Sequence, residues 1–220
     1  MKRVFLYLAA VAALIMVGGA AYIIFIKEQE STAADKWDYT IGHLDEIGRT
    51  KDEGSRLAAH YAEIAAQEQQ HTIARLLRAI ATAEAIQCEM CRKGARAFGY
   101  NSNTHQQHSL PSKRSSRANM LHIIDRKADY HAQHLAPYTH RAMRQGNRYV
   151  ARLMAWCSAS DIAQIMFLQR ATTDLDNFPT GMGEYIYYVC PKCSNLSDDE
   201  FTCHLCPNCM TPKEEFIIFD

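Results

Sequence analysis

The sequence has no excess of charge of either sign, because 24 lysines and arginines stand against 24 aspartates and glutamates in 220 residues. Proteins that bind nucleic acid through its phosphates usually carry a clear basic surplus, so we expect no nucleic-acid partner. The cysteines also lack the spread of a disulfide framework. Five of the eight lie between Cys190 and Cys209, and such clustering favours a metal site over disulfide staples.

Charge is missing altogether from one long stretch near the amino terminus, Val4 to Ile26. Its 23 residues are enough to span a bilayer as a helix. The small residues 18–21 would suit a signal-peptide cleavage site, but the apolar run continues beyond them. Lys2 and Arg3 precede the run, which predicts a cytoplasmic amino terminus. We therefore predict a single-pass anchor in the cell membrane over residues 1–27, a linker over 28–36 and extracytoplasmic soluble domains.

Proline is absent between Trp37 and Ala95, where apolar residues recur at the three- and four-residue spacing of an amphipathic helix. The pattern breaks near Gln67–Gln70, continues to about residue 95, and stops at a loop over residues 99–117. It resumes over about 118–143, breaks at Gly146 and resumes again over 149 to about 173. We therefore predict four helices over residues 37–178, in two pairs that cover about 37–95 and 118–174. Two helix pairs of this kind pack naturally as a four-helix bundle.

The two helix pairs resemble each other at an offset of 77 residues. Glu84 then matches Asp161, and Gln87 matches Gln164. An acid followed three residues later by Gln places both side chains on one helix face in each half. The identities are few, but they are consistent with a duplicated helix pair.

The tail, residues 185–220, carries two Cys-x-x-Cys turns, Cys190/Cys193 and Cys206/Cys209. Two such turns can complete a tetrahedral four-sulfur shell for one Zn or Fe ion. A disulfide-stapled tail is the alternative. Cys203 also allows the second turn to use Cys203 and Cys206, although Cys-Pro-Asn-Cys repeats the form of Cys-Pro-Lys-Cys and favours the first register.

Together these parts resemble the rubrerythrin family. The resemblance rests on Tyr-Val-Cys-Pro-Lys-Cys193, Cys-Pro-Asn-Cys209 and Pro-Lys-Glu-Glu-Phe216, and more weakly on the segment 73–84. It implies a mainly α fold, with a ferritin-like four-helix bundle and a small C-terminal rubredoxin-like or zinc-ribbon β domain. In the family, iron in the tail passes electrons to a di-iron site in the bundle, which reduces peroxide. Homodimers are also implied, whereas the N-terminal transmembrane helix is outside the family pattern.

The bundle departs from the family's metal motif, Glu-x-x-His on two helices. Gln87 and Gln164 stand at the two histidine positions. A neutral amide is a poor iron ligand, so we expect a di-iron centre to be severely weakened. The candidates for a degenerate bundle metal site are Glu53, Glu84, Asp129, Asp161, Gln87 and Gln164.

The remaining thiols leave two interpretations open. Cys88 and Cys91 are either a redox pair or two small residues near a helix end, and Cys157 lies in an apolar stretch typical of a core thiol. The function predicted first is a membrane-anchored, rubrerythrin-like metalloprotein whose four-cysteine iron transfers electrons to an unknown redox partner, with a link to peroxide defence. The alternative is a scaffold or binding module with a metal-free bundle and a structural zinc.

Overall fold

The computed structural model describes residues 37–100, 111, 114–177, 185–198 and 204–220. The chain divides into two compact units, Met1–Tyr39 and Thr40–Asp220, and the bundle and sheet belong to the second. The predicted membrane anchor, residues 1–27, and Cys203 lie outside the described residues. Within the described ranges, no helix combines the length and the apolar character needed to cross a membrane.

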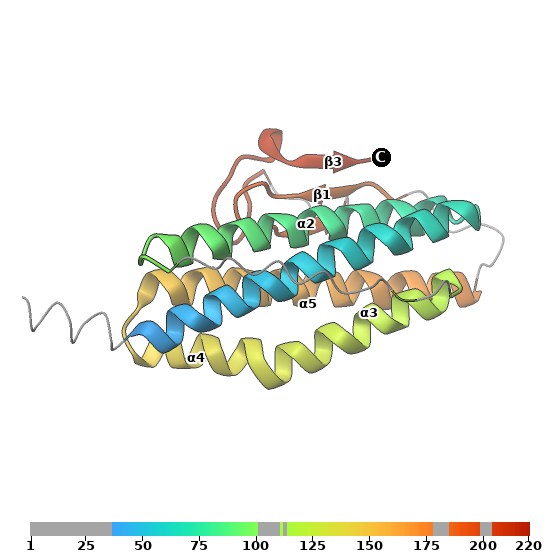
Figure 1. Ribbon diagram of the computed structural model, residues 1–220. Helices are drawn as coiled ribbons and strands as arrows, with labels where there is room; N and C mark the ends of the chain where they lie inside the picture. The colour runs from blue at the N-terminus through green and yellow to red at the C-terminus, as the bar shows by residue number, and fades with distance from the viewer. Residues whose placement is uncertain (1–36, 101–110, 112–113, 178–184, 199–203) are drawn as a thin grey trace, which may run out of the picture. The chain divides into compact units, whose positions relative to one another are not determined.

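The second unit is mainly helical (Figure 1). A first helix over residues 37–67 is followed by α2 (His71–Arg96), and a short turn with Gln69 at φ 60° separates them. Two more helical rods follow, one made of α3, η1 and α4, and the other of α5 (Arg148–Asn177). The described residues therefore contain the four predicted helices, with Gly146 at φ 76° in the turn before α5.

Buried side chains of the first helix follow an alternating spacing of three and four residues. This spacing places one side chain per turn on a single face, which packs into the core. One of the core positions is occupied by a charged residue, Lys51. The buried positions in this series are Leu44, Ile47, Lys51, Ala58, Tyr61 and Ala65.

The third rod combines α3 (Ser116–Tyr130), the π-helical turn η1 (His131–Leu135) and α4 (Ala136–Arg144). Pro137, at the start of α4, has no N–H to give to the preceding turn. A π turn holds one residue more than an α turn and tolerates such an interruption. The extra residue explains a detail of the repeat, because the offset between the halves is 76 from Lys51 to Lys127, before the turn, and 77 from Tyr61 to Tyr138, after it.

The C-terminal part forms the predicted small sheet. Its strands β1 (Tyr187–Val189), β2 (Leu196–Asp198) and β3 (Ile217–Phe219) pair antiparallel in the order β2-β1-β3, and the 3-10 turn η2 (Lys213–Glu215) precedes β3. β1 and β3 contact α2, and β2 contacts α2 and α5. Tyr187 is buried against Phe167 of α5, with ring centroids 5.9 Å apart. Sheet and bundle therefore share one hydrophobic core.

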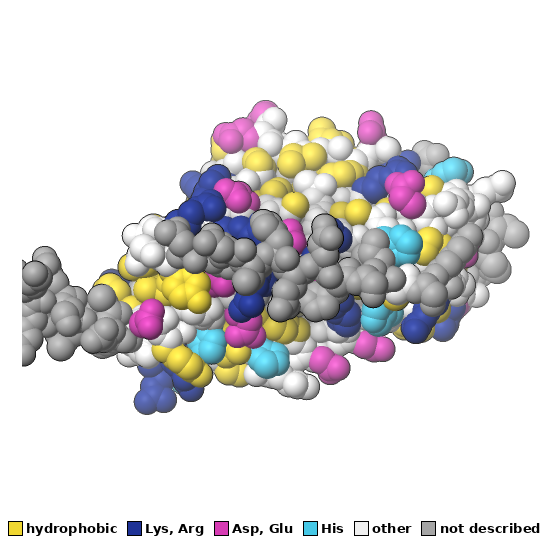
Figure 2. All heavy atoms as spheres, in the orientation of Figure 1, with side chains coloured by type: hydrophobic (Ala, Val, Ile, Leu, Met, Phe, Trp, Pro, Cys, Tyr) yellow, Lys and Arg dark blue, Asp and Glu magenta, His cyan; other side chains and the backbone are white. Residues whose placement is uncertain are grey.

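The surface carries no segregated charge on the side that can be seen. Figure 2 shows basic and acidic side chains intermixed over this face. Opposite charges also alternate along the first helix, where Arg56 pairs with Asp52 one turn away at 3.4 Å. Such exposed pairs contribute little to stability individually.

Candidate functional site

The four cysteines of the two turns converge on one point. Their sulfurs all lie within 4.8 Å of one another. The Cys190 and Cys209 sulfurs are 3.5 Å apart, and those of Cys193 and Cys206 are 3.4 Å apart. A tetrahedral ion with metal–sulfur bonds of ~2.3 Å needs sulfurs roughly 3.8 Å apart. The four-cysteine site therefore fits one tetrahedral ion with small adjustments.

The two turns have the same backbone geometry. The N–H of Ser194 donates to the carbonyl of Cys190 at 2.9 Å, and the N–H of Met210 donates to the carbonyl of Cys206 at 2.9 Å. Ser194 and Met210 both lie in the left-handed region, at φ 64° and 62°. This region strains any residue with a Cβ. In each turn the left-handed residue directly follows the second cysteine, and both sulfurs of the turn lie at the shared four-sulfur centre.

Hydrogen bonds to the Cys190 sulfur favour its thiolate form. The Cys193 thiol is the main donor, and the backbone N–H groups of Cys193 and Lys192 add to it, so that the pKa of Cys190 falls to about 4 despite burial. The thiolate is the form that ligates metal. Cys190, Cys193 and Cys206 are fully buried, whereas Cys209 is half-buried.

Helix α5 holds the four-cysteine site against the bundle through two hydrogen bonds. The Ser160 hydroxyl donates to the carbonyl of Ser194 at 2.8 Å, and the Trp156 indole N–H donates to the carbonyl of Asn208 at 3.2 Å. Gln164 extends the first contact inward, because its amide donates to the Ser160 hydroxyl at 3.0 Å. A hydrogen-bonded chain thus links the first cysteine turn to the middle of the bundle.

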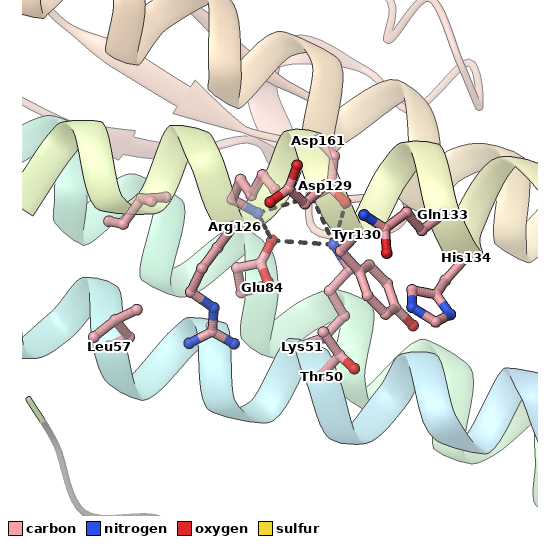
Figure 3. A pocket seen from close by; sticks show the side chains of 13 residues that line it. Thr50, Lys51, Leu57, Glu84, Arg126, Asp129, Tyr130, Gln133, His134 and Asp161 are labelled. Carbon is pink, nitrogen blue, oxygen red and sulfur yellow. Dashed lines mark hydrogen bonds and ion pairs between the residues drawn. The ribbon is translucent and has the colours of Figure 1, made fainter.

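The middle of the bundle contains four buried charges, which we call the ion quartet: Lys51, Glu84, Lys127 and Asp161. One comes from each helical rod, and none is more than 9% exposed. The Lys51 ammonium lies 2.6 and 2.5 Å from the two Asp161 oxygens and 3.4 Å from Glu84 (Figure 3). The Lys127 ammonium contacts Glu84 and lies 2.8 Å from Asp161.

The quartet pairs two basic with two acidic side chains, and its contacts shift the pKa of Lys51 and of Asp161. Burial alone would lower the pKa of Lys51, but Asp161 and Glu84 outweigh it and raise that pKa well above its usual range. Burial would raise the pKa of Asp161, yet Lys127 and Lys51 hold it well below its usual range. Ion pairs this deep require such mutual compensation to be tolerated.

A glycine and a pocket adjoin the quartet. A Cβ at Gly54 would collide with the Glu84 carboxylate, so glycine makes the room in which this carboxylate lies. A pocket of about 310 Å³ reaches all four charged side chains and is lined further out by Arg126, Tyr130 and His134 (Figure 3).

The residues in the bundle core do not fit a di-iron centre. Two ammonium groups already contact the facing oxygens of Glu84 and Asp161. A metal ion at this point would have to displace them or lie against their like charge. Gln87 and Gln164 are fully buried in place of imidazoles, and amides are weak iron ligands.

The structure separates the predicted degenerate ligands. Glu84 and Asp161 come together in the quartet, but Glu53 pairs with Arg126 at 3.6 Å, and Asp129 is exposed at the pocket. Both atoms of the Gln87 amide lack a hydrogen-bond partner among the described residues, as does the Gln164 carbonyl oxygen. Buried amides in this state usually hold ordered water.

Sequence reasoning missed Lys51 and Lys127, although a signal was present. Lys51 continues the three-four spacing of buried residues in the first helix, and Lys127 follows the buried Met120 and Ile123 at the same spacing. A lysine at a core position of an amphipathic helix requires a buried acid as its partner. The predicted ligands Glu53 and Asp129 each lie two residues after these buried lysines.

The thiols of the bundle are arranged differently from the predicted Cys88/Cys91 pair. The Cys91 sulfur lies 3.7 Å from that of Cys157, between α2 and α5. The hydrogen bond with Cys157 and burial both raise the pKa of Cys91, and burial raises the pKa of Cys88 to about 11. Thiols that stay protonated react slowly. A redox role for Cys88 and Cys91 stays a prediction.

Comparison with solved structures identifies the fold. No protein-family model matches the chain, and neither does any curated protein. Among solved structures, fully reduced, all-ferrous nigerythrin matches with a TM-score of 0.72 and 19% identity, over 82% of this chain and 86% of that one. The chain has the fold of nigerythrin.

Two further matches agree with that fold. Nigerythrin in its mixed-valence state gives a TM-score of 0.71 at 18% identity. An open-pore ferritin from the hyperthermophilic archaeon Archaeoglobus fulgidus gives 0.57 at 11% identity and covers 63% of this chain and 85% of its own. Nigerythrin is a rubrerythrin-family protein, so the expected combination of a ferritin-like bundle with a C-terminal four-cysteine domain is confirmed at the level of the fold.

Proposed function

We propose that the protein is a rubrerythrin-like metalloprotein whose working centre is the four-cysteine site, with one iron ion that carries single electrons. The convergence of four sulfurs within 4.8 Å carries this proposal. The similarity to all-ferrous nigerythrin supports iron as the ion. An iron held by four thiolates supplies reversible one-electron chemistry, and the chain's own residues set its environment.

These residues hold the thiolates, exclude water and leave one side open. The N–H groups around Cys190 stabilise its negative charge, and three of the ligands are buried. Cys209 is the half-buried one, and the two apolar residues that flank the second turn in the sequence are exposed, Leu205 at 42% and Met210 at 64%. We propose that a redox partner docks at this side, since exposed apolar residues around a redox centre favour a brief, non-obligate contact.

The bundle supports the four-cysteine site and is not proposed to reduce peroxide. The ion quartet occupies the place where oxygen ligands would have to face a metal, and we derive no step through an iron pair. Helix α5 of the bundle supports the site, because Ser160 and Trp156 donate hydrogen bonds to the two cysteine turns.

The test is the metal content and visible spectrum of the full chain, produced with iron in the medium. We expect one iron per chain, a red colour from iron–thiolate absorption and reversible bleaching on reduction. The variant Cys206→Ser should lose most of the colour, whereas Lys192→Ser, an exposed change within the first turn, should keep it. A chain that takes up no metal with all four cysteines present would refute the proposal.

A second candidate is a structural zinc in the same site. It is favoured by one observation: within the described residues, the four cysteines are the one group of three or more His, Cys, Asp and Glu side chains close enough to share an ion. That part of the chain therefore offers no second such group to receive electrons from the site. A colourless chain with one zinc, which unfolds in the C-terminal sheet when the zinc is chelated, would favour this candidate over the electron carrier.

We also propose that residues 4–26 anchor the protein in a membrane, because they form an uncharged run of 23 residues. Fractionation should then find the full chain in the membrane pellet after carbonate washing, and a chain that starts at residue 37 in the supernatant. A reporter fused to the carboxy terminus would report whether the soluble domains lie outside the cytoplasm, as the positions of Lys2 and Arg3 predict.

A further inference from the structure

The ion quartet has the charge balance of a divalent metal site. Two carboxylates from α2 and α5 face each other, and two ammonium groups from the other two rods bring two positive charges between them. Each ammonium contacts both carboxylates. The lysines therefore bridge the acids in the way that a divalent ion between two carboxylates would.

The two halves of the bundle supply this arrangement in the same way. Each half gives one lysine from its first rod and one acid from its second, Lys51 with Glu84 and Lys127 with Asp161. The lysines match at an offset of 76 and the acids at 77. The π turn η1, which begins four residues after Lys127, explains the difference. The quartet is thus a property of both halves and not of one chance pair.

We propose that Lys51 and Lys127 are built-in cations which close a divalent-metal site between Glu84 and Asp161, and that removing both lysines opens the site to a hard divalent ion. This proposal concerns the bundle alone and does not depend on which metal the four cysteines bind. Two ionised carboxylates left facing each other in the core would be strongly destabilising. A bound divalent ion would restore neutrality.

The opened site would prefer oxygen-binding ions. Its donors are the carboxylates of Glu84 and Asp161, which suit Mn²⁺ and Mg²⁺ better than soft ions. The pocket of about 310 Å³ that reaches the quartet gives an ion and its waters a route to this point. Gly54 leaves the space in which the Glu84 carboxylate lies, because a Cβ there would collide with it.

The experiment uses the full chain with zinc in the four-cysteine site, and Mn²⁺ as the probe. Free Mn²⁺ has a six-line electron paramagnetic resonance signal that weakens on binding, and thiolate sites compete poorly for this ion. We expect no Mn²⁺ binding by the wild type. We expect one Mn²⁺ per chain for Lys51→Met/Lys127→Met, together with a rise in Tm on the order of 10 °C when Mn²⁺ is added.

The matched control also removes the acids, as Lys51→Met/Lys127→Met/Glu84→Gln/Asp161→Asn. It has the same lysine changes but none of the four charges of the quartet, so it should fold without Mn²⁺ and bind none. If the double variant folds only with Mn²⁺, the proposal holds, because the ion then replaces the lysines. The proposal is overturned if the wild type binds Mn²⁺ as tightly as the double variant. It is equally overturned if the double variant takes up none, or stays unfolded with Mn²⁺ while the control folds.

Discussion

Replacing Lys51 by methionine tests the energetic role of the ion quartet. Lys51 is 2% exposed and contacts both acids. Among the described residues, Lys51→Met therefore leaves Lys127 as the one ammonium group in contact with the two buried carboxylates. Leaving a buried charge uncompensated costs about 3–5 kcal/mol. For a chain of this length that corresponds to a fall in Tm of roughly 6–20 °C. Urea unfolding at pH 7, followed by far-ultraviolet circular dichroism, measures the loss.

The same variant should also change the pH dependence. The lowered pKa of Asp161 gives stability that is present above about pH 4, its unfolded value, and is lost as the pH falls through the folded pKa. The raised pKa of Lys51 gives stability that is present below about pH 10 and is lost as the pH rises through its folded pKa. Without Lys51 the acids protonate more readily, so the stability gap to the wild type should narrow from pH 7 toward pH 4.

Two controls separate the quartet from general effects of the substitution. Lys93→Met removes a lysine that is 69% exposed and should change the free energy of unfolding by less than about 0.5 kcal/mol. Lys51→Met/Asp161→Asn removes one charge of each sign and should recover most of the loss. A Lys51→Met variant within about 1 kcal/mol of the wild type at pH 7, with an unchanged pH profile, would refute the reasoning.

Three further changes test the surroundings of the two centres by urea unfolding. Gly54→Ala should destabilise the protein by about 1–3 kcal/mol, because its methyl group would collide with Glu84. The control Gly42→Ala lies in the same helix with open space around it and should stabilise the protein by up to about 1 kcal/mol. Equal effects of the two changes would contradict the steric reason. Gln87→Met should stabilise by about 1 kcal/mol, because it removes a buried amide without partners among the described residues; a clear loss would instead mean that the amide binds something. Met210→Gly should stabilise the metal-free C-terminal part by up to about 1 kcal/mol. Glycine removes the steric strain of the left-handed backbone at this position, and little packing is lost because Met210 is exposed. A loss of stability would show that contacts of the Met210 side chain outweigh this strain.

The four-cysteine site and the four helices could be predicted from the sequence because their signals are local. A Cys-x-x-Cys turn fixes two sulfurs by itself, and the breaks at Gln69 and Gly146 coincide with left-handed residues between helices. The acids Glu84 and Asp161 were found through the repeat at offset 77, since helix α2 and helix α5 are both uninterrupted around them.

The partners of these acids could not be predicted in the same way. The π turn at His131–Leu135 adds one residue to the third rod, so the offset of 77 leads from Lys51 to Ala128 and not to Lys127. Pro137 marks an interruption of the third rod, but a proline alone does not distinguish a π turn from a kink or a helix end. The approach of Cys91 to Cys157 likewise depends on how α2 packs on α5, which no motif spacing records.

We propose that metal binds at the four cysteines and that two lysines take its place in the bundle. A crystal structure of the iron-loaded chain, with anomalous data collected at the iron edge, tests it most directly. We predict one strong anomalous peak, between Cys190, Cys193, Cys206 and Cys209, and lysine side-chain density between Glu84 and Asp161. An anomalous peak between Glu84 and Asp161, with Lys51 and Lys127 turned away, would contradict it.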